Sequence, residues 1–278
     1  MPVVAMLHPG RMGAALAAQA RRSGTQVLWC SADRSAATSR RAEAAGLTAL
    51  PRLADVLAAA DIVMSVCPPE FAEDVAADVA GHGYQGIFVE ANAISPQRCL
   101  RIGERLTQAG ATVVDGGIIG PPPRAGVAAR LYVAGRQRSL DVVAGIFHDS
   151  DVKVVAVRDE VGAASALKMA FAGYNKISLV LSAVSHALAA RHQVTEQLMA
   201  EAERLRPAPL ARPDSLPGMA ASAWRWAPEM HEIADALDAA GLPSDLARAA
   251  ASVLAHWQSD KDSWELSVAD VLARLDGP

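Results

Sequence analysis

The stretch Val3–Gly13, VVAMLHPGRMG, joins a short apolar run to a turn with two glycines and then to a helical sequence. An apolar run without polar alternation is typical of a strand that is covered on both faces. Gly10 and Gly13 occupy the second and third glycine positions of the pattern G-x-G-x-x-G, whereas His8 stands at the first. The stretch therefore predicts either a phosphate-binding turn between a strand and a helix, or an ordinary turn with incidental glycines.

The first half of the chain repeats this alternation of strand and helix. Apolar runs lie at Val3–Leu7, Val27–Cys30, Asp61–Val66, Gly86–Ala91, Ala111–Asp115, Leu131–Gly135 and Val152–Val157. Amphipathic helices are predicted between the earlier runs, at Met12–Arg22, Ser35–Ala45, Leu53–Ala59, Glu70–Ala80 and Pro96–Gln108. This order predicts an α/β, Rossmann-type, doubly wound sheet of parallel strands.

After Val161 the strand pattern stops, and helical sequences rich in alanine and leucine follow. We expect a dinucleotide-binding Rossmann domain at residues 1–160, followed by an all-α domain for substrate binding and dimerisation at 161–278. The longest apolar stretch, Ala166–His192, contains two lysines and an asparagine, so it predicts a buried helix rather than a membrane span.

Composition excludes several classes of protein. The net charge of −4 over 278 residues gives no basic footprint for nucleic acid. The three cysteines follow no metal-ligand spacing, and their small odd number suits a reducing compartment. Without a secretory leader or a long apolar span, the chain is expected to be cytoplasmic, with no metal and no membrane or nucleic-acid partner.

The position of the turn, directly after the first strand, favours the cofactor-binding alternative. Gly10 would let a phosphate approach the backbone, and Gly13 would let the helix lie close to the strand. Pro9, Gly10, Arg11, Met12 and Gly13 are therefore predicted to bind the cofactor. His8 departs from the pattern, although Pro9 can still set the turn.

The residues after the second strand bear on the choice of cofactor. An acidic residue at this point would hold the ribose hydroxyls of NAD, but Ser31 stands there, followed by Arg34 and Ser35. Arginine binds phosphate oxygens in a bidentate manner, so these residues favour NADP. Asp33 keeps NAD possible, and a basic, solvated helix start is the alternative reading. Cys67 and Pro68, after the run Asp61–Val66, are also predicted to line the cofactor, and no histidine arrangement supports a nucleophilic cysteine.

Three motifs resemble those of the β-hydroxyacid dehydrogenases, the family of 6-phosphogluconate dehydrogenase, 3-hydroxyisobutyrate dehydrogenase and the imine reductases. Leu7–Gly13 corresponds to G-L-G-x-M-G, and Asp115–Pro121 corresponds to the substrate loop D-A-P-V-S-G-G without its serine. Gly162–Lys168 matches G-x-G-x-x-x-K-x-x-x-N at the lysine, but Ala172 stands at the asparagine position. Pro228–Glu229 aligns with a late Lys-Asp pair.

The resemblance implies a homodimer formed through the helical domains, with a small-molecule substrate bound between the sheet domain and the helical domain. It places Asn92 against the nicotinamide and Lys168 as the general acid/base, which Asn175 would assist from two turns further along the same helix. A lysine that reaches solvent and an asparagine that caps a loop are the alternatives. The predicted substrate-binding residues are Gly117, Ile118, Ile119, Gly120 and Tyr174.

These features together predict an oxidoreductase, NADP-preferring, that transfers a hydride between the nicotinamide and a small carbonyl or hydroxy compound. An imine reductase is the alternative among enzymes. A non-catalytic dinucleotide-binding sensor or scaffold is the alternative outside them, since the chain lacks several side chains that the family uses.

Overall fold

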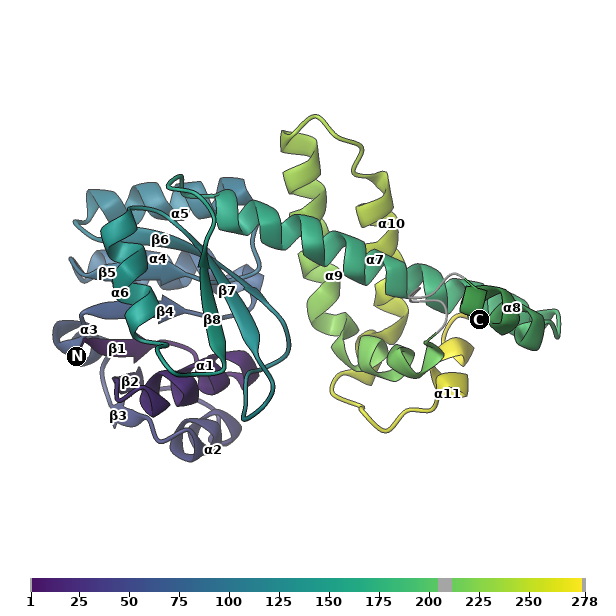
Figure 1. The fold of residues 1–278 in the computed structure, drawn as a ribbon, viewed down its shortest axis with the longest axis horizontal. Helices are drawn as coiled ribbons and strands as arrows, with labels where there is room; N and C mark the ends of the chain where they lie inside the picture. The colour runs from purple at the N-terminus through teal and green to yellow at the C-terminus, as the bar shows by residue number, and fades with distance from the viewer. Residues whose placement is uncertain (1, 205–211, 277–278) are drawn as a thin grey trace. The chain divides into compact units, whose positions relative to one another are not determined.

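A computed structural model describes residues 2–204 and 212–276, and the chain divides into two compact units, Met1–Lys168 and Met169–Pro278 (Figure 1). The division falls inside helix α7 (Ala163–Arg191), so this helix begins in the first unit and ends in the second. The boundary predicted from the sequence lies earlier, at residue 160, before the helix begins.

The first unit contains one eight-stranded sheet with the strand order β3-β2-β1-β4-β5-β6-β7-β8. Its strands are β1 (Val3–Met6), β2 (Gln26–Cys30), β3 (Thr48–Leu50), β4 (Ile62–Ser65), β5 (Ile87–Glu90), β6 (Thr112–Ile119), β7 (Ala129–Ala134) and β8 (Val152–Ala156). The order turns back between β1 and β4, which is the point where doubly wound sheets open a crevice for ligands. The predicted Rossmann-type fold is confirmed.

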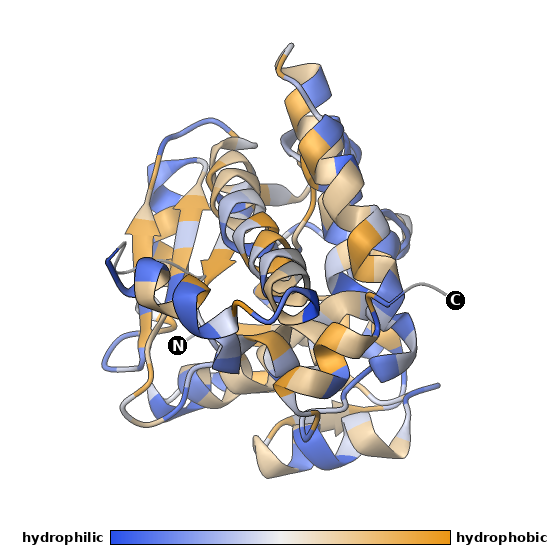
Figure 2. Ribbon diagram, turned by 90° about the vertical axis from the view of Figure 1, so that its right-hand side faces the viewer, coloured by the Kyte–Doolittle hydropathy of each residue, from blue (hydrophilic) through white to orange (hydrophobic). Residues whose placement is uncertain are grey.

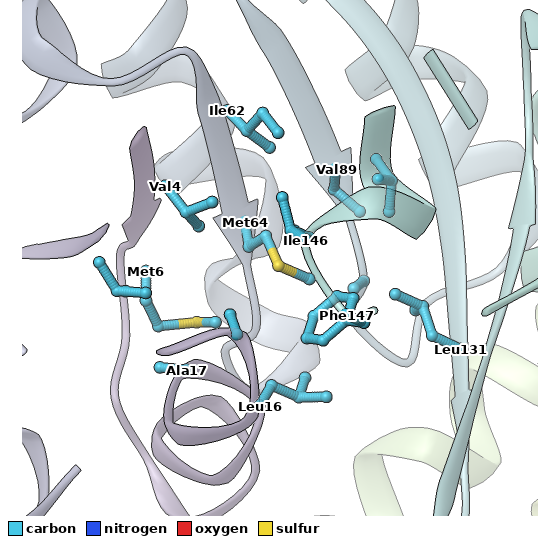
Figure 3. Close-up of a cluster of buried hydrophobic side chains, with 14 of the residues drawn as sticks. Val4, Met6, Leu16, Ala17, Ile62, Met64, Val89, Leu131, Ile146 and Phe147 are labelled. Atoms are coloured by element: carbon cyan, nitrogen blue, oxygen red, sulfur yellow. The ribbon is translucent and has the colours of Figure 1, made fainter. Parts of the chain in front are cut away.

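Helices cover both faces of the sheet because successive strand residues point to opposite sides. Val4 and Met6 pack with the core residues of one face, while Ala5 and Leu7 pack on the other. The first face is covered by α1 (Arg11–Arg22), α2 (Ala36–Ala44) and α6 (Gln137–Gly145); the second by α3 (Leu53–Ala59), α4 (Ala72–Gly81) and α5 (Pro96–Gln108). Figure 2 shows the strands largely in the orange of hydrophobic residues, and Figure 3 shows the core of the first face.

The structure differs from the predicted sheet domain in five respects. Strand β3 and helix α6 were not predicted, and η1 (Pro69–Phe71), a short 3-10 helix, precedes α4 where one helix was expected. Strand β6 runs on to Ile119, through a segment that was predicted as a loop. It pairs with β7 in the antiparallel direction, so the expectation of an all-parallel sheet is wrong at this one pair.

Asp115, in the middle of β6, anchors the first turn of α7. Its buried carboxylate accepts hydrogen bonds from the backbone N–H groups of Gly162 (2.8 Å), Ala164 (2.8 Å) and Ser165 (3.1 Å), and from the Ser165 hydroxyl (2.6 Å). These are N–H groups that a helix start leaves without partners, and a negative charge there is favoured by the helix dipole. One side chain therefore ties the start of α7 to the sheet.

In the described part of the second unit, residues 169–204 and 212–276, helices are joined by turns and loops, and there is no strand. Besides α7 it contains α8 (Thr195–Arg204), η3 (Pro213–Ser215), α9 (Leu216–Ala239), α10 (Asp245–Leu254), η4 (Ala255–Asp260) and α11 (Val268–Ala273). Helix α9 packs against α10, η4 and α11, and the fully buried Trp257 donates a hydrogen bond from its indole nitrogen to the Val271 carbonyl (2.8 Å). Across residues 2–204 and 212–276, no helix has the length and apolar character to cross a membrane.

We expect Asp115→Asn to lower the free energy of unfolding by about 2–4 kcal/mol, because an amide replaces the charge and turns one acceptor into a donor that faces other donors. Asp55→Asn, which removes an exposed ion pair with Arg52, is the matched control and should leave the unfolding midpoint unchanged. Urea titration followed by circular dichroism measures both, and equal midpoints for the two variants would contradict the anchoring role.

Candidate functional site

The turn between β1 and α1 accommodates His8 without strain. Among the described residues, no positive φ occurs between His8 and Gly10, so the first position of the motif does not need a glycine here. The His8 carbonyl accepts a hydrogen bond from the Gly10 N–H (2.8 Å), which closes the turn. A Cβ on Gly13 would lie 2.3 Å from the same carbonyl oxygen, so Gly13 is required for α1 to lie on β1.

The N-terminus of α1 is open to an anion. Gly10 is its N-cap and gives no side-chain cap, and the first turn contains no acidic residue. A Cβ on Gly10 would meet no atom within 4 Å. The N–H groups at the start of a helix, here at Arg11 and Met12, point out of the helix end and attract phosphate. The turn therefore fits the pyrophosphate of a dinucleotide.

Basic residues border the turn. Arg41 of α2, which the sequence analysis did not select, donates from Nε to the Pro9 carbonyl (3.4 Å) and from a terminal nitrogen to Thr38 Oγ1 (3.0 Å). Arg34 is exposed in the loop between β2 and α2. Ser35, in the same loop, caps α2, because its Oγ accepts from the Thr38 N–H (3.2 Å).

Ser31 continues the pairing of β2 with β3 by one residue. Its N–H donates to the Leu50 carbonyl (2.9 Å), and its hydroxyl donates to the same oxygen (3.3 Å). Two of the three predicted residues at this end, Ser31 and Ser35, thus have structural contacts of their own. The arginine side chains are the ones that add positive charge next to the turn.

His8 is half-buried, and its Nδ1 atom is buried with no hydrogen-bond partner among the described residues. Burial, reinforced by the Arg34 guanidinium, lowers the pKa of the imidazole to about 4. The ring is therefore neutral at pH 7, with one polar atom that awaits a partner. From the sequence alone, His8 stands out only as a departure from the motif.

Asn92 joins the loops that follow β4 and β5. Its Oδ1 accepts from the Cys67 N–H (2.5 Å), and its Nδ2 donates to Ser65 Oγ (2.9 Å). Its own N–H donates to Glu90 Oε1 (3.0 Å). Asn92 is buried, so it acts within the protein as a clamp that fixes the position of Cys67 and of Pro68 beside it.

The groups beneath this clamp are uncharged at neutral pH. Burial raises the pKa of the Cys67 thiol to about 12, an effect that the nearby Glu90 reinforces, and a thiol that stays protonated is a poor nucleophile. Burial also raises the pKa of Glu90 to about 8; hydrogen bonds from Asn92 oppose this, and Asp115, its neighbour on β6, adds to it. Glu90 Oε2 has no hydrogen-bond partner among the described residues.

The structure brings together Gly117 and Lys168. A Cβ on Gly117 would lie 2.7 Å from the Ala164 carbonyl oxygen and 3.2 Å from the Lys168 Cβ, so α7 crosses β6 at close range there. Lys168 is half-buried. The helix start that Asp115 anchors thus sets the Lys168 backbone directly over the glycine predicted to bind substrate.

Other predicted substrate residues lie elsewhere. Ile118 is in the core of the sheet and Ile119 is half-buried; both belong to β6, where they pair with β7 instead of forming a loop. Gly120 follows with a φ of 128°, which favours glycine. The contact of these residues with substrate stays a prediction, and the burial of Ile118 leaves it to their backbone groups.

Asn175 and Tyr174 belong to the part of α7 in the second unit, and both are exposed. The buried residue of this turn is Lys176, which forms an ion pair with Glu229 of α9. Its Nζ lies 5.4 Å from the centre of the Trp226 ring. Sequence reasoning aligned Glu229 with a family lysine-aspartate pair but did not predict this partner.

Neither a metal site nor a pocket adds to these candidates among the described residues. Within residues 2–204 and 212–276, no group of three or more His, Cys, Asp or Glu side chains could hold a metal ion. A surface pocket of about 300 Å³ lies where β4 and β5 begin, between residues such as Ala60 and Gly86. It lies at the amino ends of the strands, whereas the turn after β1 lies at their carboxyl ends, and none of the candidate residues line it.

Two family patterns match the chain. The family described as the NAD binding domain of 6-phosphogluconate dehydrogenase matches residues 4–158, and a family described as a domain of unknown function (DUF1932) matches residues 189–257. No curated protein sequence matches the chain.

Solved structures with the same fold are distant in sequence. The 3-hydroxyisobutyrate dehydrogenase of Mycobacterium tuberculosis is 20% identical with a TM-score of 0.78, and 100% of each chain is covered. Psf3 in complex with NADP+ is 18% identical with a TM-score of 0.71, over 98% of this chain and 99% of that one. A variant of the imine reductase of Myxococcus stipitatus in complex with NAD+ is 18% identical with a TM-score of 0.60, over 99% and 98%.

The two glycines of the turn should respond differently to substitution. Gly13→Ala places a methyl group against a backbone oxygen and should lower the free energy of unfolding by about 3 kcal/mol. Gly10→Ala fills open space at an N-cap and should cost less than about 1 kcal/mol. Denaturant titration of both variants measures the difference; if the order of the two were reversed, the packing described for the turn would be wrong.

Proposed function

The chain belongs to the family of the NAD-binding domain of 6-phosphogluconate dehydrogenase, and we therefore propose that it is an NADP-preferring oxidoreductase. It transfers a hydride between the nicotinamide and a small carbonyl or hydroxy compound. The observation that carries this proposal is the open, uncapped start of α1 at Gly10, bordered by Arg34 and Arg41.

The cofactor is held by the first unit. The pyrophosphate is received at the helix start, beside Pro9 and Gly10, by backbone N–H groups of the first turn of α1 at Arg11 and Met12. Arg34 supplies positive charge for a 2′-phosphate, and the Asn92 clamp keeps the loop of Cys67 and Pro68 in position. The residue after β2 is Ser31, so no carboxylate stands at this position to bind the ribose hydroxyls of NAD.

Lys168 moves the proton. When bound, the nicotinamide supplies or accepts the hydride, and the substrate oxygen must then gain or lose a proton. Asp115 fixes the start of α7 and Gly117 admits the helix, so the Lys168 ammonium is presented from a defined backbone position. A positioned lysine of this kind acts as a general acid in reduction and as a base in oxidation. We further propose that Asn175, two turns after Lys168 on α7, donates a hydrogen bond to the substrate.

One observation favours the second candidate, an imine reductase. Ile119 and Ala172 stand at the positions where the resemblance places a serine and an asparagine, so two hydrogen-bond donors for a substrate oxygen are absent. A C=N substrate needs a proton at nitrogen but fewer donors. Parallel assays with small 3-hydroxy acids and with cyclic imines, each in the presence of NADPH, separate the two activities.

The protein is further proposed to be a cytoplasmic homodimer. All three cysteines are free thiols, which suits a reducing compartment. Phe171, Tyr174 and Leu181 are 47%, 71% and 65% exposed and recur on one face of α7. A helix face with three large apolar side chains in solvent fits burial against the same face of a second copy.

The cofactor assignment is tested by titrating the protein with NADPH and with NADH, followed by quenching of tryptophan fluorescence. We expect NADPH to bind at least about tenfold more tightly, which corresponds to one charge-assisted contact. Arg34→Ala should abolish this preference, while Gly10→Ala should weaken the binding of both cofactors. If neither cofactor binds to the folded wild-type protein, the proposed function is wrong.

The catalytic assignment is tested with Lys168→Ala. The variant should bind NADPH within about threefold of wild type and lose about 10²–10⁴-fold in kcat, since a general acid/base contributes a factor of this size. Lys153→Ala, at an exposed lysine of β8, is the matched control and should keep full turnover. Turnover retained by Lys168→Ala would remove this residue from its role. NADPH binding without turnover of any tested substrate by wild type would favour the sensor or scaffold.

The dimer is tested by analytical ultracentrifugation of Leu181→Asp. A charge on the apolar face should convert the dimer to a monomer at micromolar concentration, because burying an unpaired carboxylate is costly. Leu246→Asp, on α10, alters a leucine that is also 65% exposed and should leave the dimer intact. Dissociation by both variants, or by neither, would argue against a dimer formed through α7.

A further inference from the structure

Resting on the proposed cofactor site, we infer that His8 is a specificity-determining residue. Its imidazole binds the 2′-phosphate of NADP together with the Arg34 guanidinium, and in this way it favours NADP over NAD.

The backbone of His8 explains how a side chain is tolerated at this position. Its φ is not positive, and its carbonyl closes the turn onto the Gly10 N–H. Replacing the usual glycine therefore leaves the turn itself intact. It adds an imidazole at the end of β1 that is close enough to Arg34, in the loop after β2, for the two groups to interact electrostatically.

The imidazole holds an unmet hydrogen-bonding group. Nδ1 is buried and has no partner among the described residues. A buried polar atom in this condition is rare in folded proteins and points to a ligand, a water or an ion. The other candidate phosphate binders of the region, Ser31 and Ser35, already contact Leu50 and Thr38.

The charges near His8 favour an anion. Arg34 lies in the loop after β2, Arg41 of α2 binds the Pro9 carbonyl, and Arg11 begins α1. Asp33 is the acidic residue of the same loop and is exposed. A protonated His8 is disfavoured in the free protein by burial and by Arg34, which lower its pKa to about 4. A phosphate dianion between the imidazole and the guanidinium would reverse this balance.

This arrangement couples NADP binding to proton uptake. The pKa of His8 rises when the phosphate binds, so binding is strengthened as the pH falls toward the pKa of the complex. NAD presents hydroxyl groups in place of the phosphate and gains no such charge. The preference for NADP should therefore be larger at pH 6 than at pH 8.

The experiment measures the dissociation constants of NADP+ and NAD+ by calorimetry on the full-length protein at pH 6, 7 and 8. Wild type is compared with His8→Gln and His8→Gly, and with His82→Gln, a control at an exposed histidine of the same unit. Thermal melts establish that each variant is folded. Two different substitutions at His8 are made so that the test still holds if one variant does not fold.

We expect the ratio of the two constants to fall at least about tenfold at pH 6 in both His8 variants, with NAD+ binding unchanged within threefold. Buffers of different ionisation enthalpy report protons taken up with NADP+. The phosphate titrates in every variant, so the excess uptake of wild type over His8→Gln belongs to the imidazole. The control should match wild type in both measurements.

The outcomes separate this inference from the proposed function. If wild type binds NADP+ and the His8 variants keep its ratio, its pH dependence and its proton uptake, the role of His8 is wrong and the cofactor site stands. If His8→Gly tightens both cofactors equally, His8 only obstructs the turn and the inference is overturned. If wild type binds neither cofactor, the proposed function and the inference fall together.

Discussion

A buried carboxylate, Asp115, sets the geometry on which the candidate site depends. A charge inside the sheet must be satisfied, and the N–H groups at the start of α7 are the donors that satisfy it. Strand, helix start and charge are thus placed together. Gly117, two residues further along β6, then lets α7 approach at Ala164, and Lys168 lies one helical turn after Ala164. The position of the Lys168 backbone therefore follows from the hydrogen bonds that the buried Asp115 carboxylate accepts.

Much of the sheet could be predicted because its strands are covered on both faces and therefore read as apolar runs. Strand β3 escaped this reading: it has three residues, lies at the edge, and exposes Thr48 and Ala49. The antiparallel pairing of β6 with β7 was missed for another reason. A run of apolar residues does not report the direction of the strand beside it, and β6 continued through two glycines that resembled a loop.

Within the candidate site, too, only the residues whose roles depend on a local pattern could be predicted from the sequence. Gly10 and Gly13 could be recognised because their roles depend on residues within one turn of chain. The anchoring of α7 by Asp115 and the clamp formed by Asn92 join residues 47 and 25 positions apart, and neither leaves a local pattern. The Lys176–Glu229 pair was missed for the same reason. His8 lies between these cases, since its position was visible but the isolation of its Nδ1 atom was not.

Glu90 makes the stability of the sheet depend on pH in the direction opposite to that of most carboxyl groups. In the fold its pKa is about 8, against the ordinary 4.5, so between these values the folded chain carries one proton more than the unfolded chain. The stability linked to this proton is fully present below the ordinary value and is lost as the pH rises through about 8. Most carboxyl groups help acid to unfold a protein. This one makes folding at neutral pH a step that draws a proton from the solvent.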